Sequence, residues 1–306
     1  MKQISKLKGK RVKSKSSIWN AENLSGWLFI AAAMCAFGFF TLYPVISAIE
    51  TSMLEYKPFG SEFVGLDNYK AAFDSSLFWK SIYNTVIYTV AVVPVSLFIT
   101  FIISVMIIPF KKRSQTIFKA LYYLPAVASG VATAVVWAWL YSSSSSGIFN
   151  QIASFLGLPQ QNWLGSSSTA MFSLILMAWL SSHGTSIIIY MAALHGIDNS
   201  YYEAAEIDGA SFLQKVFYIV APLCKPTTLF LLVTGIIGSF QVFMNAYMMT
   251  GGGPDNNTTM IGLLIFNNAF VYAKYGLACA QAILLAIVIG FLTMIQFKVA
   301  GDEVEY

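Results

Sequence analysis

The segment that decides the fold reads SYYEAAEIDGASFLQKVFYIVAP at residues 200–222, and it is charged and amphipathic between two long apolar segments. Ser200 and Glu203 have the S-x-x-E spacing of a capping box, in which a hydroxyl and a carboxylate accept hydrogen bonds from free backbone N–H groups at a helix start. This spacing predicts that a helix begins at Tyr201.

The same segment predicts a bend and a second helix. Gly209 is the residue type that tolerates the left-handed conformation found after a helix end. Ser211 and Gln214 repeat the capping spacing directly afterwards. We therefore expect the first helix to end near Asp208 and the second to begin near Phe212.

Composition places the whole chain in a membrane. The 306 residues are 57% hydrophobic and 10% charged, whereas a soluble domain carries about 25% charged residues. The three cysteines, Cys35, Cys224 and Cys279, have no C-x-x-C spacing. We expect buried free thiols and neither a disulfide framework nor a metal site.

Six segments are apolar and long enough to cross a hydrocarbon core, which needs about 20 residues. A basic tail at 1–25 precedes them and an acidic tail at 300–306 follows, so the membrane domain is expected at 26–299. We expect the first span to be retained rather than cleaved as a signal peptide, and Pro94 to kink the second. The expected spans are 26–49, 82–110, 118–141, 170–194, 227–249 and 275–297.

One further apolar segment is too short to cross. Residues 147–157 place Ile148, Ile152, Phe155 and Leu156 on one face of a helix. This pattern predicts a helix that lies on the outer surface of the membrane.

The basic residues predict which way the chain crosses. An even number of spans leaves both termini on one side, together with the 200–222 segment. Fourteen basic residues fall on that side and four on the other. Because cytoplasmic loops carry the excess of Lys and Arg, we expect both termini and the segment in the cytoplasm.

Polar residues within the spans suggest a path for a solute. Gln241 and Asn245 are candidates to bind sugar hydroxyls, and Phe243, Tyr247 and Trp179 are candidates to stack on a sugar ring. The alternative is that the amides join helices to one another, a common use of Asn and Gln in membranes. The residues expected to share one face of the fifth span are Thr234, Gly238, Gln241, Asn245 and Met249.

Ser182 and His183 lie in the middle of the fourth span, where polar groups are expected to face other helices or a water-filled path. They do not predict a hydrolase, because adjacent residues on a helix point about 100° apart and cannot act as nucleophile and base. We favour a hydrogen bond between helices for His183 over contact with a substrate.

The chain contains no G-x-x-x-x-G-K-[ST] phosphate loop, so it is not expected to bind ATP in that manner. No catalytic residue and no metal ligand is predicted. ATP and Mg²⁺ are expected on a partner, and this chain is expected to be a transport subunit rather than an enzyme.

The motif E-A-A-x3-G-x9-I-x-A-P from Glu203 to Pro222 resembles the EAA loop of permease subunits in bacterial binding-protein-dependent ABC importers. The family pattern usually ends in Leu-Pro, whereas this chain has Ala221-Pro222. The difference therefore lies in the apolar C-terminal end of the loop. In that family the loop is the coupling helix that docks on the ATPase subunit, and we call residues 200–222 the coupling loop. The resemblance assigns ATPase coupling to Tyr201, Glu203, Ala204, Ala205, Asp208, Gly209 and Phe212.

Three further stretches are similar to the carbohydrate-uptake branch, with the maltose-type subunits as the model. They are FVGLDNY at 63–69, WLG at 163–165 and TGGGP at 250–254. The resemblance implies the type I importer permease fold, all α-helical with six spans, in the bacterial inner membrane. It also implies a second permease, two ATPase subunits, an extracytoplasmic binding protein and a sugar substrate moved by alternating access.

Two alternatives stay open. An ABC permease for a non-sugar solute would share the coupling loop. A secondary transporter usually carries ionisable residues in its spans, and the expected spans contain only His183 and, at the very start of the third, Lys119.

Overall fold

The computed structural model describes residues 21–57, 60–145, 147–181 and 183–300. Apart from one hairpin, the regular structure in this part of the chain is helical. The chain divides into two compact units, Met1–Glu50 and Thr51–Tyr306.

The first unit contains α1 (Ala21–Phe37), a π-helical turn (Gly38–Leu42) and most of α2 (Tyr43–Ser52). Together they include one apolar span at Gly26–Ser52 that has no buried residue in its most apolar window. Cys35 is exposed here, so the expectation of a buried thiol is wrong at this position. A helix that is apolar all round fits a lipid environment.

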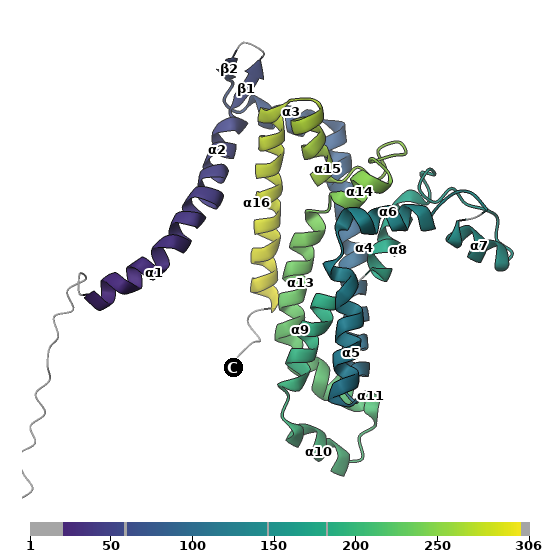
Figure 1. Cartoon of the computed structure of the whole chain (residues 1–306). Helices are drawn as coiled ribbons and strands as arrows, with labels where there is room; N and C mark the ends of the chain where they lie inside the picture. The colour runs from purple at the N-terminus through teal and green to yellow at the C-terminus, as the bar shows by residue number, and fades with distance from the viewer. Residues whose placement is uncertain (1–20, 58–59, 146, 182, 301–306) are drawn as a thin grey trace, which may run out of the picture. The chain divides into compact units, whose positions relative to one another are not determined.

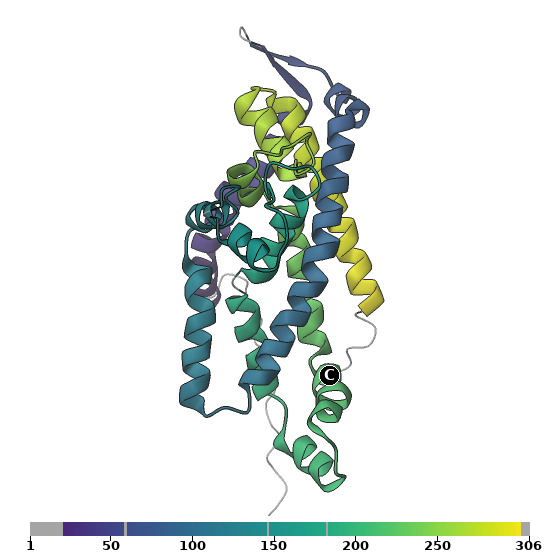
Figure 2. The same ribbon diagram turned by 90° about the vertical axis from the view of Figure 1, so that its right-hand side faces the viewer.

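The second unit is arranged around α4 (Ser76–Ile107), which packs against α8 (Ala170–Leu180), α9 (Gly184–His195) and α13 (Lys225–Phe240) (Figures 1 and 2). Its N-cap is Ser75, whose hydroxyl accepts a hydrogen bond from the Phe78 N–H. The helix continues through Pro94 for all of its 32 residues and is a single span. The predicted kink at Pro94 does not interrupt the helix.

Three other spans are bent pairs of helices rather than single helices. Together with Gly26–Ser52, Ser76–Ile107 and Tyr275–Lys298 they give up to six crossings in the described part of the chain. In the first pair, α5 (Lys112–Tyr123) with its 3-10 turn (Leu124–Val127) meets α6 (Gly130–Leu140) at 93°. In the second, α8 (Ala170–Leu180) meets α9 (Gly184–His195) at 42°. In the third, the helical stretch Phe212–Leu223 meets α13 (Lys225–Phe240) at 66°.

The prediction of one continuous helix over 227–249 is wrong. α13 ends at Phe240, and α14 begins only at Met244 and ends at Met249. The break lets the backbone carbonyl of Val242 approach Gly262, where an added Cβ would lie 3.0 Å from that oxygen. Because of this break, the residues expected to share one face between Thr234 and Met249 do not lie on a single helix.

Smaller elements complete the second unit. The strands β1 (Leu54–Lys57) and β2 (Gly60–Phe63) pair antiparallel, with Leu54 opposite Phe63. The remaining helices are α3 (Asp67–Asp74), α7 (Ile148–Phe155), α10 (Asn199–Ile207), α11 (Phe212–Lys215), α12 (Ala221–Leu223), α15 (Ile261–Phe266) and α16 (Tyr275–Ala300), with π-helical turns at Val216–Val220 and Asn267–Val271.

Four clusters of buried side chains lie in the described part of this unit, and two of them bear on the sites described below. One includes Tyr88, Tyr141 and Leu174, from α4, the end of α6 and α8. The other joins Tyr190 of α9 to Val216 and Val220, at the base of the coupling loop. The free thiol of Cys224 is buried in this second cluster.

Candidate functional site

The coupling loop begins with a cap that differs from the predicted one. Asp198 is the N-cap of α10, and its carboxylate accepts a hydrogen bond from the Ser200 N–H at 2.8 Å. The predicted capping box of Ser200 and Glu203 is therefore wrong. A carboxylate at a helix N-terminus is favoured by the helix dipole, and the hydrogen bond from Ser200 holds the pKa of Asp198 below its ordinary value of 3.8.

The bend after α10 is the one that the sequence predicts. Gly209 has a φ of +72°, in the left-handed region. The N–H of Gly209 donates to the Glu206 carbonyl at 3.1 Å, and the N–H of Ala210 donates to the Ala205 carbonyl at 2.9 Å. This pair of hydrogen bonds is a Schellman motif, which satisfies the last carbonyl groups of the helix.

The second helix begins with the predicted capping box. The Ser211 N–H donates to Gln214 Oε1 at 2.7 Å, and the Gln214 N–H donates to Ser211 Oγ at 3.4 Å. Both helix ends at the bend therefore have their backbone groups paired within the loop.

A salt bridge joins the two short helices. Lys215 Nζ lies 2.8 Å from Glu206 Oε1, and only 17% of the Lys215 side chain is exposed. The hydrogen bond and the charge of Lys215 hold the pKa of Glu206 below its ordinary value. Val216 and Val220, which follow directly, are buried against Tyr190 and Leu194. The loop is thus a folded projection with its base in the helix bundle.

The loop projects beyond the bundle (Figure 1). Glu203 and Ala204 are exposed, whereas Ala205 is only 8% exposed. Ala205 therefore lies on the inner side of α10 and not on the outer surface. The large exposed apolar side chains of the loop are Tyr201, Ile207, Phe212, Leu213, Phe217 and Tyr218.

A hollow of about 250 Å³ lies at the bend of the loop. Asp208, Gly209 and Ala210 form one wall, and Gln214, Lys215 and Tyr218 belong to the facing wall. Among the predicted coupling residues, the structure thus places Asp208 and Gly209 at the hollow, and Tyr201 and Phe212 on the exposed surface.

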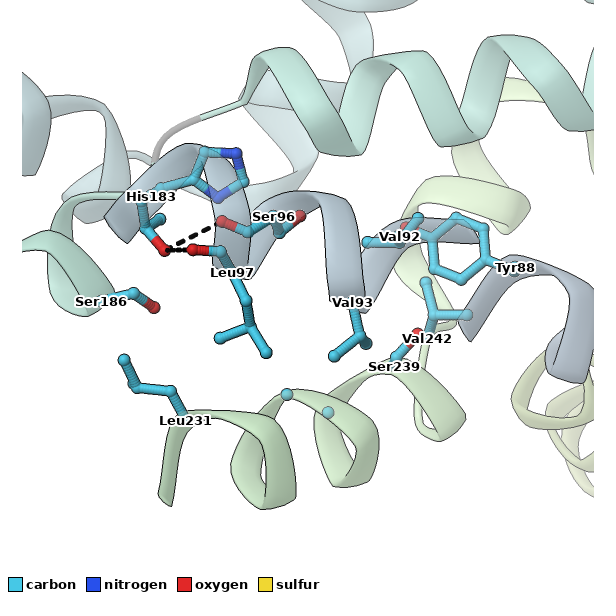
Figure 3. A pocket seen from close by; sticks show the side chains of 13 residues that line it. Tyr88, Val92, Val93, Ser96, Leu97, His183, Ser186, Leu231, Ser239 and Val242 are labelled. Carbon is cyan, nitrogen blue, oxygen red and sulfur yellow. Dashed lines mark hydrogen bonds between the residues drawn. The ribbon is translucent and has the colours of Figure 1, made fainter. Parts of the chain in front are cut away.

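A second region of interest is a cavity of about 210 Å³ between α4, α9 and α13 (Figure 3). Ser96 of α4 and Ser239 of α13 line it, together with His183 and Ser186. The hydroxyl oxygens of Ser96 and Ser239 are buried and have no hydrogen-bond partner among the described residues. Buried polar groups are normally paired, so these hydroxyls are available to a solute or to water.

A larger cavity of about 570 Å³ lies between α4, α5, α6 and α8. Trp179, Ser181 and His183 line it, and Ser181 Oγ also has no partner among the described residues. His183 thus lines both cavities.

His183 also replaces a backbone hydrogen bond that is lost at the break between α8 and α9. Its Nε2 lies 2.9 Å from the Trp179 carbonyl oxygen, the acceptor that an unbroken helix would pair with the backbone N–H of residue 183. The Trp179 indole N–H in turn donates to the Ala91 carbonyl of α4 at 3.0 Å. His183 therefore bonds within its own bent span, and Trp179 makes the bond between helices that was favoured for His183.

The other predicted substrate residues lie elsewhere. Phe243 and Tyr247 stack with ring centroids 5.3 Å apart, and Phe266 of α15 completes an aromatic cluster. Asn245 lies close to Tyr88, which lines the 210 Å³ cavity. None of Gln241, Phe243, Asn245 and Tyr247 lines either of the two cavities, and Ser182 lies outside the described residues.

The sequence analysis missed Ser96 and Ser239. Each is one of several hydroxyl residues in its helix, where serine normally bonds to the backbone of the preceding turn. Only the three-dimensional structure shows that these two hydroxyls lack that bond.

Residues 69–302 match the family described as "Binding-protein-dependent transport system inner membrane component". The chain belongs to this family of permeases. The resemblance seen in the coupling loop is therefore confirmed, and the permease is an inner membrane component of an ABC transport system.

Several relatives align with the permease over nearly its whole length. It is 33% identical to the probable ABC transporter permease protein YesP of Bacillus subtilis, with 95% of each chain covered. It is 30% identical to the arabinooligosaccharides transport system permease protein AraP of Bacillus subtilis, with 94% of each chain covered. It is also 30% identical to the lactose transport system permease protein LacF of Rhizobium radiobacter, with 95% of this chain and 98% of LacF covered.

The fold of the permease matches a solved transporter. A chain of a bacterial ABC transporter that imports the acidic polysaccharide alginate superimposes with a TM-score of 0.82, over 93% of this chain and 97% of that one. The two sequences are 22% identical, so this comparison supports the fold alone.

Proposed function

We propose that this permease forms the path for a sugar or oligosaccharide through the membrane in an ATP-driven importer. The observation that carries the proposal is the coupling loop, a folded projection with exposed apolar side chains and the charge of Glu203. The printed names of AraP and LacF support a sugar as the solute. The unpartnered hydroxyls of Ser96 and Ser239 offer hydrogen bonds that suit such a solute.

The proposed mechanism is alternating access. ATP and Mg²⁺ bind a dimer of partner ATPase subunits, which moves the coupling loop of this chain and that of a second permease. Val216 and Val220 at the base of the loop pack against α9 and α13. A displacement of the loop therefore also moves these helices, which surround the 210 Å³ cavity. An extracytoplasmic binding protein delivers the solute, and both termini lie in the cytoplasm.

A non-sugar solute is the nearest alternative. The sn-glycerol-3-phosphate transport system permease protein UgpA of Yersinia enterocolitica is also 30% identical, with 92% of this chain covered. A phosphate group is usually bound by Arg or Lys. Neither residue lines the 210 Å³ or the 570 Å³ cavity, which favours an uncharged sugar.

The test is ATP hydrolysis by the assembled transporter in lipid vesicles, with and without sugar-loaded binding protein. We expect stimulation by one class of sugar, loss of stimulation in Glu203→Lys, and an intermediate effect in Glu203→Gln, which removes the charge but keeps the shape. Transport that proceeds unchanged in Glu203→Lys, or without any ATPase in the complex, would contradict the coupling role.

A further inference from the structure

The helix α7 presents an apolar surface that the proposed function does not use. Ile148, Ile152, Phe155 and Leu156 are all exposed, and Phe155 is 91% exposed. At about 100° per residue these four side chains fall within one arc of roughly 100° around the helix axis. A contiguous exposed apolar face of this kind marks an interaction site.

The opposite side of α7 is fixed to the protein. Asn150 is 1% exposed, and its amide group makes four hydrogen bonds of 3.0 to 3.1 Å, to Ser142, Trp163 and twice to Gln161. The ring of Phe149 stacks on Tyr141 at 4.6 Å between centroids. These contacts hold the helix in one orientation, so its outward face is a constant feature of the surface.

A third side of the helix is polar. Gln151 and Ser154 are exposed and lie next to one another around the axis, between the apolar arc and the fixed side. Gly157, with a φ of +72°, ends the helix, and the Leu158 N–H donates to the Ala153 carbonyl at 2.8 Å. The helix thus has one side against protein, one apolar side and one polar side.

This three-sided arrangement suits the boundary between lipid and water. There a helix needs an apolar side for acyl chains and a polar side for headgroups and water. A soluble protein partner would be a poor fit, because such interfaces are about as polar as the rest of a protein surface, and the arc has no polar side chain.

Position and charge agree with a lipid contact. α7 lies to the side of α6 and α8, well away from α10 (Figure 1). Trp137 and Trp163, residue types enriched at membrane interfaces, pack around Phe149 at its base. No Asp, Glu, Lys or Arg occurs anywhere from residue 120 to residue 197.

We propose that the apolar face of α7 is a membrane-interface anchor that inserts among the acyl chains of the outer leaflet, next to the permease bundle. The anchor binds uncharged or zwitterionic lipid and does not depend on anionic lipid, because no charged side chain takes part. Since Phe149 stacks with Trp137, which lines the 570 Å³ cavity, the anchor fixes one wall of that cavity relative to the membrane surface.

Two neighbouring positions test this proposal in the full-length chain within the assembled transporter. Phe155→Cys and Ser154→Cys, each made after Cys35, Cys224 and Cys279 are replaced by Ala, are labelled with an environment-sensitive fluorophore and reconstituted in phosphatidylcholine vesicles. Quenching is measured with iodide in the water and with phosphatidylcholine brominated on its acyl chains. Transport activity is not part of the readout, so the result does not depend on the proposed function.

We expect the label at 155 to be quenched several-fold more by brominated lipid than the label at 154, and the order to reverse with iodide. Added phosphatidylglycerol should leave both values unchanged. Equal access of iodide to the two labels would overturn the proposal. Shielding of position 155 that occurs only when loaded binding protein is added would also overturn it and would identify a protein-docking face instead.

Discussion

Gly209 shows how one residue type can determine the geometry of the coupling loop. An added Cβ there would meet no atom within 4 Å, so the only cost of a side chain is its φ of +72°. We predict that Gly209→Ala destabilises the bend by about 1–2 kcal/mol and lowers stimulated ATP hydrolysis. Gly290→Ala in α16, where an added Cβ also meets nothing, is the control and should leave hydrolysis unchanged.

Variants of Ser96 and Ser239 can distinguish an effect on sugar binding from an effect on the stability of the fold. Because they have no partner among the described residues, the double variant Ser96→Ala/Ser239→Ala should raise the thermal unfolding temperature or leave it unchanged. We predict that the same variant slows sugar uptake. Ser104→Ala is the contrast, since Ser104 Oγ contacts the carbonyls of Thr100 and Ile187 and its loss should lower the unfolding temperature. A double variant with normal uptake would show that these hydroxyls do not contact the sugar.

Local chemistry explains which single residues could be predicted from the sequence. The positive φ of Gly209 and the capping box of Ser211 and Gln214 depend on a few adjacent residues, and both are confirmed. The start of α10 was wrong because Asp198, a charged acceptor, takes the N-cap position instead of Ser200. Ser96 could not be identified, because a helical serine usually bonds to its own backbone, and the sequence carries no sign that Ser96 does not.

At the scale of elements, the salt bridge between α10 and α11 gives the coupling loop a dependence on pH. The pKa of Glu206 in the folded loop is below its ordinary value of 4.5. The stabilising contribution is therefore present above about pH 4.5 and is lost as the pH falls through the lowered value. We predict faster amide hydrogen exchange in residues 205–215 at acidic pH, after correction for intrinsic rates, and no such additional change in Glu206→Gln.

The contact between α9 and α5 depends on the absence of a side chain. A Cβ on Gly184 would lie 2.5 Å from the Tyr122 carbonyl oxygen and 2.6 Å from the Tyr123 Cα, and backbone atoms cannot move aside cheaply. We predict that Gly184→Ala lowers stability by about 1–3 kcal/mol, measured by thermal unfolding in detergent. An unfolding temperature equal to that of the wild type would mean that the two helices are farther apart than described.

Helix breaks were the elements that the sequence predicted least well. Pro94 was expected to kink α4, and the helix continues through it without a break. The break between α13 and α14 contains neither proline nor glycine, so no local sequence signal marks it and it was missed. Apolar periodicity is nearly the same in a straight span and in a bent pair, so it identified the segments but not their bends.

At the scale of the whole molecule, the distribution of charge predicts the orientation in the membrane. Six crossings would put fourteen basic residues on the side of the coupling loop and four on the other, so the loop should face the cytoplasm. Ile207 of the loop and Phe63 of the hairpin are 87% and 72% exposed. In a chain without its native cysteines, an impermeant thiol reagent applied to spheroplasts should label Phe63→Cys and spare Ile207→Cys. Labelling of position 207 but not of position 63 would show that the coupling loop faces outward.

The paired helix ends of the coupling loop affect the thermodynamics of association with an ATPase. Ordering a flexible segment costs about 1–2 kcal/mol of backbone conformational entropy per residue. Here the cap of Asp198, the Schellman motif at Gly209 and the box at Ser211 fix the backbone before any partner arrives. Binding then restricts rigid-body motion and surface side chains rather than the chain itself. Such a loop can release and rebind its partner in every transport cycle without a folding step.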